Sequence, residues 1–314
     1  MTYPIDSTIG ATYDGMSGTY IPEIWSGKLL EKFYTATVFA AISNTDYEGE
    51  ISSAGDKVII RTVPAITIRD YKLGQDLTYE RPVGDTVELL IDKGKYFAFV
   101  INNVEQKQAD LGYVDKWAED ASEQMKINID GGILADIPVD SHASNAGIVA
   151  GKISGNVNLG VATTDGSTAI GLSKATVVDK IVECGQVLDE QSVPETGRWF
   201  VLPAWVCARI KLSELKDASL TGDGKSTLRN GRTGMIDRFE LYNSNNIAPV
   251  TETTTKCYST IFGHKTALTF ASQLTENELI PNPTDFGKLM RGLQVYGYEV
   301  IHPESMGTLY CKAA

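Results

Sequence analysis

The apolar and polar positions along the chain predict a succession of distinct elements. Residues 1–20 are rich in Thr, Gly, Ser and Tyr and lack helical periodicity, which predicts an extended arm. Pro22 suits the first turn of a helix, where its missing N–H needs no partner. Apolar residues then follow at helical spacing, namely Trp25, Leu29, Leu30, Phe33, Val38 and Phe39. Residues 21–48 are therefore predicted to form an N-terminal helix region.

A long β segment is predicted for residues 49–101. Residues 57–63 are β-branched, residues 66–69 continue the pattern, and a second arm runs from Thr86 to Asp92 and on through Tyr96 to Ile101. Gly74, Pro82 and Gly84 separate the two arms, which predicts a long hairpin with a broad tip. A two-stranded ribbon of this length buries little of its own surface, so it needs another surface on which to lie.

A long amphipathic helix is predicted within residues 102–138. Its apolar stripe consists of Val104, Leu111, Val114, Ala118, Ala121 and Met125. Charged residues, including Glu119 and Glu123, occupy the opposite face. Gly131, Gly132 and Pro138 are predicted to interrupt the helix.

Residues 139–283 predict a mixed α/β region. A helix with Ser173 as its N-cap carries an apolar face of Val177, Val178, Ile181, Val182 and Leu188. Residues 199–202 predict a buried strand, and Pro203 begins a further helix. A polar loop spans residues 217–233, and a strand spans residues 235–242. In the final segment, residues 284–314, strands are predicted at 293–300 and 307–311.

Bulk properties exclude several classes of protein. The formal net charge of −12 disfavours non-specific nucleic-acid binding, because phosphate binding requires clustered Lys and Arg. The N-terminus has neither the basic nor the apolar region of a secretory signal, and no apolar run is long enough to span a bilayer. The four cysteines lie far apart without a CxxC pair, which is typical of buried thiols in a reducing compartment.

Motifs that carry chemistry are absent from the sequence. The segment Gly222-Asp223-Gly224-Lys225-Ser226 resembles the end of a phosphate-binding loop, but Ser219 stands where that motif requires glycine. The three histidines, His142, His264 and His302, form no metal-binding pattern, and no nucleophile elbow is present. We therefore expect no catalytic, cofactor or metal site, and a chain that is not an enzyme.

Several segments, in their order, resemble those of a known family. Residues 21–26 resemble its N-terminal helix entry, residues 55–58 the start of its extended loop, and residues 197–203 an inner strand before a helix. Residues 230–236 and 239–246, ending in Ser244-Asn245-Asn246, resemble a later strand. The family is the Hong Kong 97-type major capsid proteins of tailed bacteriophages, and the closest likeness is to its podovirus-type coat branch. Asp237-Arg238 departs from the pattern, because many relatives have glycine before the aromatic residue.

The resemblance implies an α+β fold with six parts. These are an N-terminal arm (1–20), an N-terminal helix region (21–48), an E-loop (49–101), a P-domain spine helix (102–138), an A-domain (139–283) and P-domain return strands (284–314).

The resemblance also implies a function, which is self-assembly into hexamers and pentamers of an icosahedral shell. That shell encloses DNA without sequence-specific binding, has portal and possibly scaffolding or decoration partners, and forms in the host cytoplasm as part of the virion. No membrane is implied. The expected inter-subunit contacts lie along the E-loop at Arg61, Arg69, Asp70, Tyr71, Lys72, Glu80 and Arg81. Three alternatives stay open: an encapsulin-type cage that holds cargo enzymes, an enzyme without a recognisable motif, and an adhesive or tail-type virion protein.

Overall fold

The computed structural model describes residues 34–46, 57–102, 113–213 and 234–314, apart from the single positions 36, 65, 85, 164 and 254. The chain divides into two units, residues 1–33 and residues 34–314. The predicted arm and most of the predicted helix after Pro22 therefore lie outside the described residues. At the end of that predicted helix, the structure has one short helix, α1 (Phe39–Ile42).

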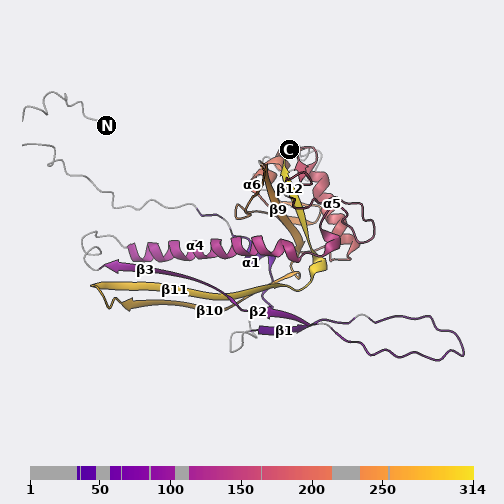
Figure 1. The fold of residues 1–314 in the computed structure, drawn as a ribbon, viewed down its shortest axis with the longest axis horizontal. Coiled ribbons are helices and arrows are strands. Elements are labelled where there is room, and N and C mark those ends of the chain that lie inside the picture. Colours follow the sequence, from indigo (N-terminus) through magenta and orange to yellow (C-terminus); the bar gives the residue numbers. More distant parts are fainter. Residues whose placement is uncertain are drawn as a thin grey trace, which may run out of the picture. The chain divides into compact units, whose positions relative to one another are not determined.

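A seven-stranded sheet forms the centre of the region after residue 140 (Figure 1). Along the sheet the order is β4-β12-β9-β5-β7-β6, and β8 pairs with β9 off this path. The β5–β7 and β12–β4 pairs are parallel, and the others are antiparallel. The strands are β4 (Ile170–Leu172), β5 (Arg198–Leu202), β6 (Met235–Ile236), β7 (Phe239–Asn243), β8 (Val250–Glu252), β9 (Thr255–His264) and β12 (Met306–Ala313).

Strand β5 is buried along its whole length because both faces of the sheet are covered. Phe200 and Leu202 point to one face, where they pack with α5 (Val177–Glu190) and α6 (Ala204–Lys211). Trp199 and Val201 point to the other face, as the alternation of a strand requires. The predictions of a buried strand here and of a helix start after Pro203 are confirmed.

The second apolar core joins the seven-stranded sheet to the long helix α4 (Tyr113–Asp136). Ile129, Ile133 and Leu134 near the end of α4 pack beside Trp199 and Val201. Strands β10 (Leu268–Pro281) and β11 (Gly287–Val300) contribute to the same core. Short 3-10 helices, η1 (Ile137–Asp140), η2 (Ala143–Asn145) and η4 (Pro303–Ser305), lie in the connections to the sheet.

A three-stranded antiparallel sheet, β10-β11-β3, runs beside α4 (Figure 1). Strand β3 (Lys93–Asn102) pairs with β11, and Phe99 of β3 meets the Trp117 ring of α4 edge-on at 5.8 Å. Lys93 at the other end of β3 lies 3.6 Å from Asp136 at the end of α4. Helix and strand therefore run antiparallel along each other.

The prediction that Gly131 and Gly132 interrupt the long helix is wrong, since α4 continues to Asp136. A glycine in a helix costs about 1 kcal/mol relative to alanine. The buried neighbours Ile129 and Ile133 outweigh that cost through their packing. Of the predicted stripe, Ala118, Ala121 and Met125 are half-buried. Val104 and Leu111 lie outside the described residues.

Two details of the next helix also differ from prediction. Helix α5 begins at Val177, and the Ser173 hydroxyl instead accepts hydrogen bonds from the Ala175 and Thr176 N–H groups at 3.3 Å in the preceding turn. Val182, placed on the apolar face, is 47% exposed. The buried face uses Cys184 and Val187 in its place, so the helix is rotated relative to the prediction.

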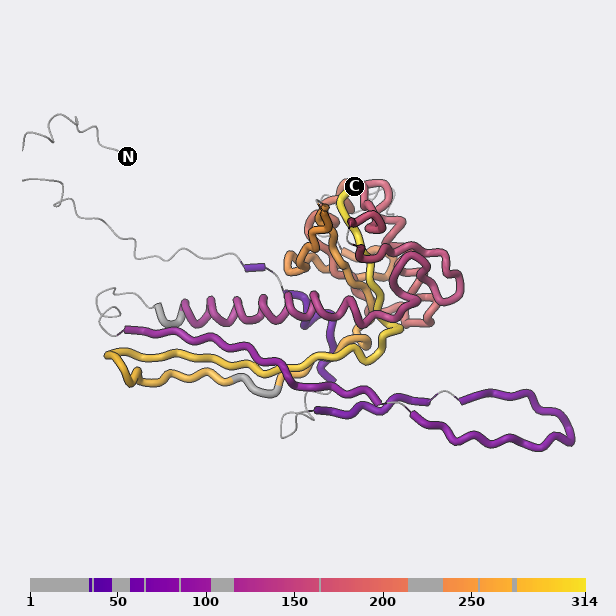
Figure 2. The backbone as a smooth tube through the Cα atoms, viewed as in Figure 1, coloured from indigo at the N-terminus to yellow at the C-terminus, as the bar shows by residue number. Residues whose placement is uncertain are grey.

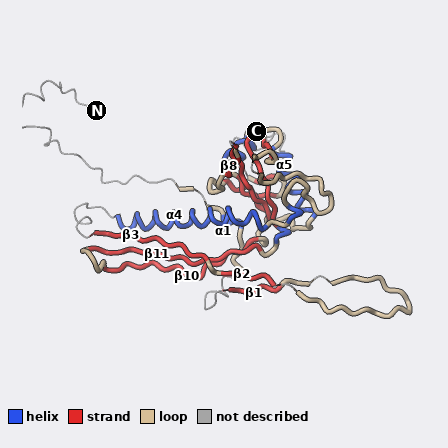
Figure 3. Tube along the Cα trace, viewed as in Figure 1, coloured by secondary structure: helices blue, strands red, loops and turns tan. Residues whose placement is uncertain are grey.

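The predicted long hairpin consists of two separate structures. Strand β1 (Lys57–Arg61) pairs with β2 (Thr86–Leu90) in a two-stranded sheet. The expected continuation of the second arm is wrong, because after Leu90 the chain leaves this sheet and β3 joins β11. Figure 3 shows the residues between β1 and β2 as loop without strand. We call residues 62–84 the extension.

The later strands also differ from the prediction in their boundaries and in their pairing. The predicted strand at 235–242 is a hairpin, β6–β7, whose turn residues Asp237 and Arg238 have φ values of 45° and 67°. The predicted boundary at 283 and 284 falls in the turn between β10 and β11, which pair along their lengths. Strand β12 belongs to the seven-stranded sheet. The assignment of the six ranges to named domains stays a prediction.

Candidate assembly surface

The base of the extension is anchored in the subunit. Ile60 of β1 and Leu89 of β2 are buried, and they pack with Ala271 of β10 and with Ile91 and Ile301, which directly follow β2 and β11. On the exposed face, the Lys57 ammonium lies 3.1 Å from the Glu88 carboxylate across the strand pair. This small apolar cluster fixes where the extension leaves the molecule.

Beyond that base, few contacts hold the two arms of the extension together. The Thr67 N–H donates to Glu80 Oε1 at 2.7 Å, and the Arg69 guanidinium lies 3.7 Å from Glu80 Oε2. At the tip, the Gln75 N–H donates to the Lys72 carbonyl at 3.1 Å, and Gly74 has the positive φ of 85° that this tight turn requires. The tube in Figure 2 shows the arms as an open loop projecting from β1 and β2.

The extension exposes an unusual number of large apolar side chains. Ile68 is 90% exposed and Leu73 is 96% exposed. Eight described residues of the extension share this property, namely Val63, Ile66, Ile68, Tyr71, Leu73, Leu77, Tyr79 and Val83. Single exposed apolar residues are ordinary, whereas a concentrated set is typical of a surface that another molecule covers.

All seven residues predicted as contacts are exposed. The structure brings Arg69 and Glu80 together across the arms, and it places Asp70, Tyr71 and Lys72 beside the tip turn. Arg61 ends β1, and Arg81 lies on the second arm. Their role in an interface stays a prediction. Apart from Tyr71, the apolar set was missed, although a β-branched and aromatic pattern with no predicted partner was visible in the sequence.

Two hollows lie elsewhere on the described surface. A shallow hollow of about 450 Å³ on the three-stranded sheet is lined by Tyr96, Ala98, Leu293, Glu276 and the paired Glu278 and Arg291. A smaller hollow of about 150 Å³ lies where β2, α4 and β11 meet, and its acidic lining residues are Asp92, Asp136, Asp140 and Glu299. Burial, followed by the nearby Asp140, raises the pKa of the Glu299 carboxyl.

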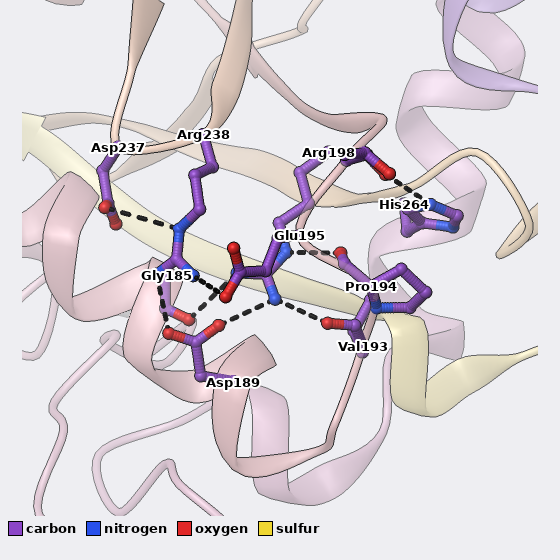
Figure 4. Close-up of polar contacts among 10 residues, drawn as sticks. Gly185, Asp189, Val193, Pro194, Glu195, Arg198, Asp237, Arg238 and His264 are labelled. Carbon is purple, nitrogen blue, oxygen red and sulfur yellow. Dashed lines mark hydrogen bonds and ion pairs between the residues drawn. The ribbon is translucent and has the colours of Figure 1, made fainter.

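A dense polar cluster beside β5 serves the fold (Figure 4). The Arg198 guanidinium is fully buried, lies 2.7 Å from Asp189, and donates to the Val193 and Pro194 carbonyls at 2.7 and 2.9 Å. Arg238 bridges Asp189 and Glu195 at 2.8 and 2.9 Å. Both guanidinium groups contact Asp189 near the end of α5, so the cluster fixes α5 and the segment before β5 to the β6–β7 turn.

The described residues form neither a metal-ligand cluster nor a helix suited to a membrane. No group of three His, Cys, Asp or Glu side chains in this part of the chain is placed to hold a metal ion. None of the helices described is both long and apolar enough to cross a membrane.

Among solved structures, the chain is similar to protein chains of phage particles. A chain from Mycobacterium phage Che8 has a TM-score of 0.77 at 26% identity, over 93% of this chain and 98% of that one. A chain of the cyanophage P-SCSP1u capsid has a TM-score of 0.73 at 13% identity, over 99% of both. A chain of the mature capsid of bacteriophage PhiM1 has a TM-score of 0.68 at 14% identity, over 92% and 91%.

Comparison of the sequence alone reveals no such relative, because no family model and no curated protein matches it. The structural likeness nevertheless spans nearly the whole length of both chains in each comparison. The predicted fold class is confirmed, whereas the assignment to the podovirus-type branch stays a prediction. The chain has the Hong Kong 97-like α+β fold of tailed-bacteriophage capsid subunits.

Proposed function

We propose that this chain is a major capsid protein that assembles into the icosahedral head shell of a tailed bacteriophage. The observation that carries the proposal is the extension, which exposes eight large apolar side chains and has few contacts of its own. A monomer gains nothing from such a surface and risks aggregation through it. In a shell, a neighbouring copy covers it.

The likeness to phage capsids supports the same conclusion, since the matched chains of P-SCSP1u and PhiM1 come from capsids. Copies of the chain then form hexamers and pentamers, with Arg61, Arg69, Asp70, Tyr71, Lys72, Glu80 and Arg81 among the contacts between subunits. The role of the chain is structural, without catalysis. The shell belongs to the virion, assembles in the host cytoplasm with portal and possibly scaffolding or decoration proteins, and encloses DNA without reading its sequence.

The test compares two pairs of serine substitutions at equally exposed apolar positions. Ile68→Ser with Leu73→Ser changes the extension, and Val139→Ser with Ile153→Ser changes side chains that are 84% and 81% exposed elsewhere. Each pair should alter the free energy of unfolding by less than about 1 kcal/mol, because the sites are exposed. Sedimentation and negative-stain microscopy should show shells, or their hexamers, for the wild type and the control pair only.

Three outcomes would count against the proposal. A wild-type chain that stays a monomer at assembly concentrations contradicts a shell role. Equal loss of assembly in both pairs shows that the extension has no special part. A small shell that encloses a cargo enzyme identifies a cage of the encapsulin type.

A further inference from the structure

The base of the extension rests on two small residues of the β10–β11 pair. Ala271 of β10 and Gly297 of β11 lie directly opposite each other in the ladder, so they share one face of the sheet. The neighbouring positions on that face of β11 carry the larger side chains of Val295 and Glu299. The pair therefore forms a local depression in the sheet, and we call Ala271 and Gly297 the seat.

The chain that leaves β2 occupies this seat. Ala271 is fully buried, and it belongs to the same small apolar cluster as Leu89 and Ile91. The main-chain carbonyl of Leu90 lies against Gly297, where an added Cβ would be 2.9 Å from the carbonyl carbon of Leu90 and 3.1 Å from Cα of Ile91. These are backbone atoms, which cannot turn aside as the end of a flexible side chain can. The crossing therefore requires glycine.

The conformation of the backbone gives no separate reason for glycine at position 297. Gly297 is not among the glycines with positive φ, and it lies within a strand, where glycine is depleted. Glycine inside a strand often marks a place where another backbone approaches closely. Tyr296 and Val300, on the other face of the strand, belong to the apolar core shared with α4. Because that core holds β11 in place, an atom added at Gly297 displaces the crossing chain.

Further contacts hold the chain on both sides of the seat. Before it, Ile60 of β1 and Leu89 of β2 are buried in the small apolar cluster. After it, the Lys93 ammonium lies 3.6 Å from the Asp136 carboxylate of α4 and 4.5 Å from the centre of the Tyr298 ring. The base of the extension is thus attached at three successive points, which together fix its direction.

A small tilt at the seat becomes a large displacement at the tip, because the extension projects from the molecule as a lever (Figure 2). Each arm has about eleven residues, so at the rise of a strand the tip lies roughly 35 Å from the base. A tilt of about 10° then moves the tip by roughly 6 Å, which exceeds the spacing of about 4.8 Å between neighbouring strands. Contacts made by the extension therefore depend strongly on the geometry of its base.

We propose that Gly297 is a positioning residue for assembly: the seat that it forms with Ala271 fixes the direction of the extension, and this direction determines the shape of the assembled particle. The inference rests on the proposed shell function and adds a determinant of particle geometry that lies within one subunit. A subunit with a tilted extension keeps its exposed apolar side chains, so it still associates. Its copies meet at altered angles, and the expected defect is a particle of the wrong shape.

The first test adds one carbon atom at the seat. Gly297→Ala is compared with Gly94→Ala on β3, where an added Cβ comes no closer than 4.0 Å to the Gln294 carbonyl oxygen. Amide hydrogen exchange in β1 and β2 should become at least about fivefold faster in Gly297→Ala and stay unchanged in β5. Negative-stain microscopy should show shells of one diameter for the wild type and Gly94→Ala, and open sheets, tubes or shells of other diameters for Gly297→Ala. Folded Gly297→Ala subunits that form shells of the wild-type diameter would overturn the proposal.

The second test loosens the seat without adding an atom, so it decides the question if Gly297→Ala does not fold. Ile91→Val acts at the seat, and Ile181→Val removes the same group from the core beside α5. Both side chains are buried, and each variant should melt a few degrees below the wild type. Only Ile91→Val should broaden the distribution of particle diameters. Identical distributions for the two variants, with a wild type that forms shells, overturn the role of the seat alone, whereas a wild type that forms no particles overturns the proposed function.

Discussion

At the scale of single residues, the buried charges fix how segments meet. Asp130 of α4 is fully buried, and its Oδ1 accepts hydrogen bonds from the Val38 and Phe39 N–H groups, both at 2.9 Å. Its Oδ2 accepts from the Asn246 amide at 2.6 Å. Helix α1 has no cap from its own side chains, so Asp130 caps it from a distance. One carboxylate thus joins α1, α4 and the segment after β7.

Removing that carboxylate should destabilise the subunit strongly. Asp130→Ala leaves two backbone N–H groups of α1 without their acceptor, and a buried unsatisfied polar group costs about 1–3 kcal/mol. We expect a loss of about 3 kcal/mol in the free energy of unfolding, measured by urea denaturation. Asp130→Asn keeps one oxygen acceptor and should lose about half as much. Glu119→Gln, at an exposed position of the same helix, should change little; an equal loss there would contradict the assignment.

The sequence could not reveal the role of Asp130. Its partners Val38 and Phe39 lie about ninety positions away, and no local pattern encodes such a contact. The buried strand around Trp199 was predictable, because a continuous apolar run needs no knowledge of its partners. The predicted contact residues lie between these cases: their exposure follows from their polarity, but the pairing of Arg69 with Glu80 depends on the shape of the loop.

At the scale of elements, periodicity predicted the type of element better than its partner. Strand β3 was recognisable from the apolar run of residues 96–101, yet it pairs with β11 and not with the arm beginning at Lys57. A period of two identifies a strand and its faces, but it does not specify the neighbour. The end of α4 was missed for a different reason. Glycine lowers helix propensity locally, whereas the packing of Ile133 that outweighs it is a tertiary effect.

Two glycines within helices should respond oppositely to alanine. A Cβ added at Gly132 of α4 meets nothing within 4 Å, so Gly132→Ala should stabilise the subunit by about 0.5–1 kcal/mol through helix propensity. At Gly185 of α5 the new atom would lie 2.3 Å from Asp237 Oδ2, which must move. Gly185→Ala should therefore destabilise the subunit and disturb the ion pairs beside Arg238. Melting temperatures of the two variants check this, and a decrease for both would contradict it.

At the scale of the whole molecule, the apolar cores and the extension have different roles. One core joins α4, β5, β10 and β11, so the two larger sheets are parts of a single folded body. The extension contributes to neither large core and remains available for another copy. Its charges are balanced, with three cationic and three acidic residues between positions 62 and 84, in a chain with a net charge of −12. Copies therefore repel one another overall, and the extension is the part that approaches with little repulsion.

Reversing charges on the extension should make assembly depend on salt. If Arg69 and Arg81 meet carboxylates of a neighbouring copy, then Arg69→Glu with Arg81→Glu replaces attraction by repulsion. Salt screens exposed charges, with a Debye length of about 10 Å at 0.1 M and about 3 Å at 1 M. The double variant should therefore assemble poorly at low salt and recover most of its assembly at high salt, whereas folding, followed by circular dichroism, stays unchanged.

Lys152→Glu with Lys174→Glu, at exposed positions far from the extension in sequence, changes the net charge equally and is the matched control. Light scattering at several salt concentrations measures both, and an equal defect in the control would show that net charge, and not contact by the extension, governs assembly.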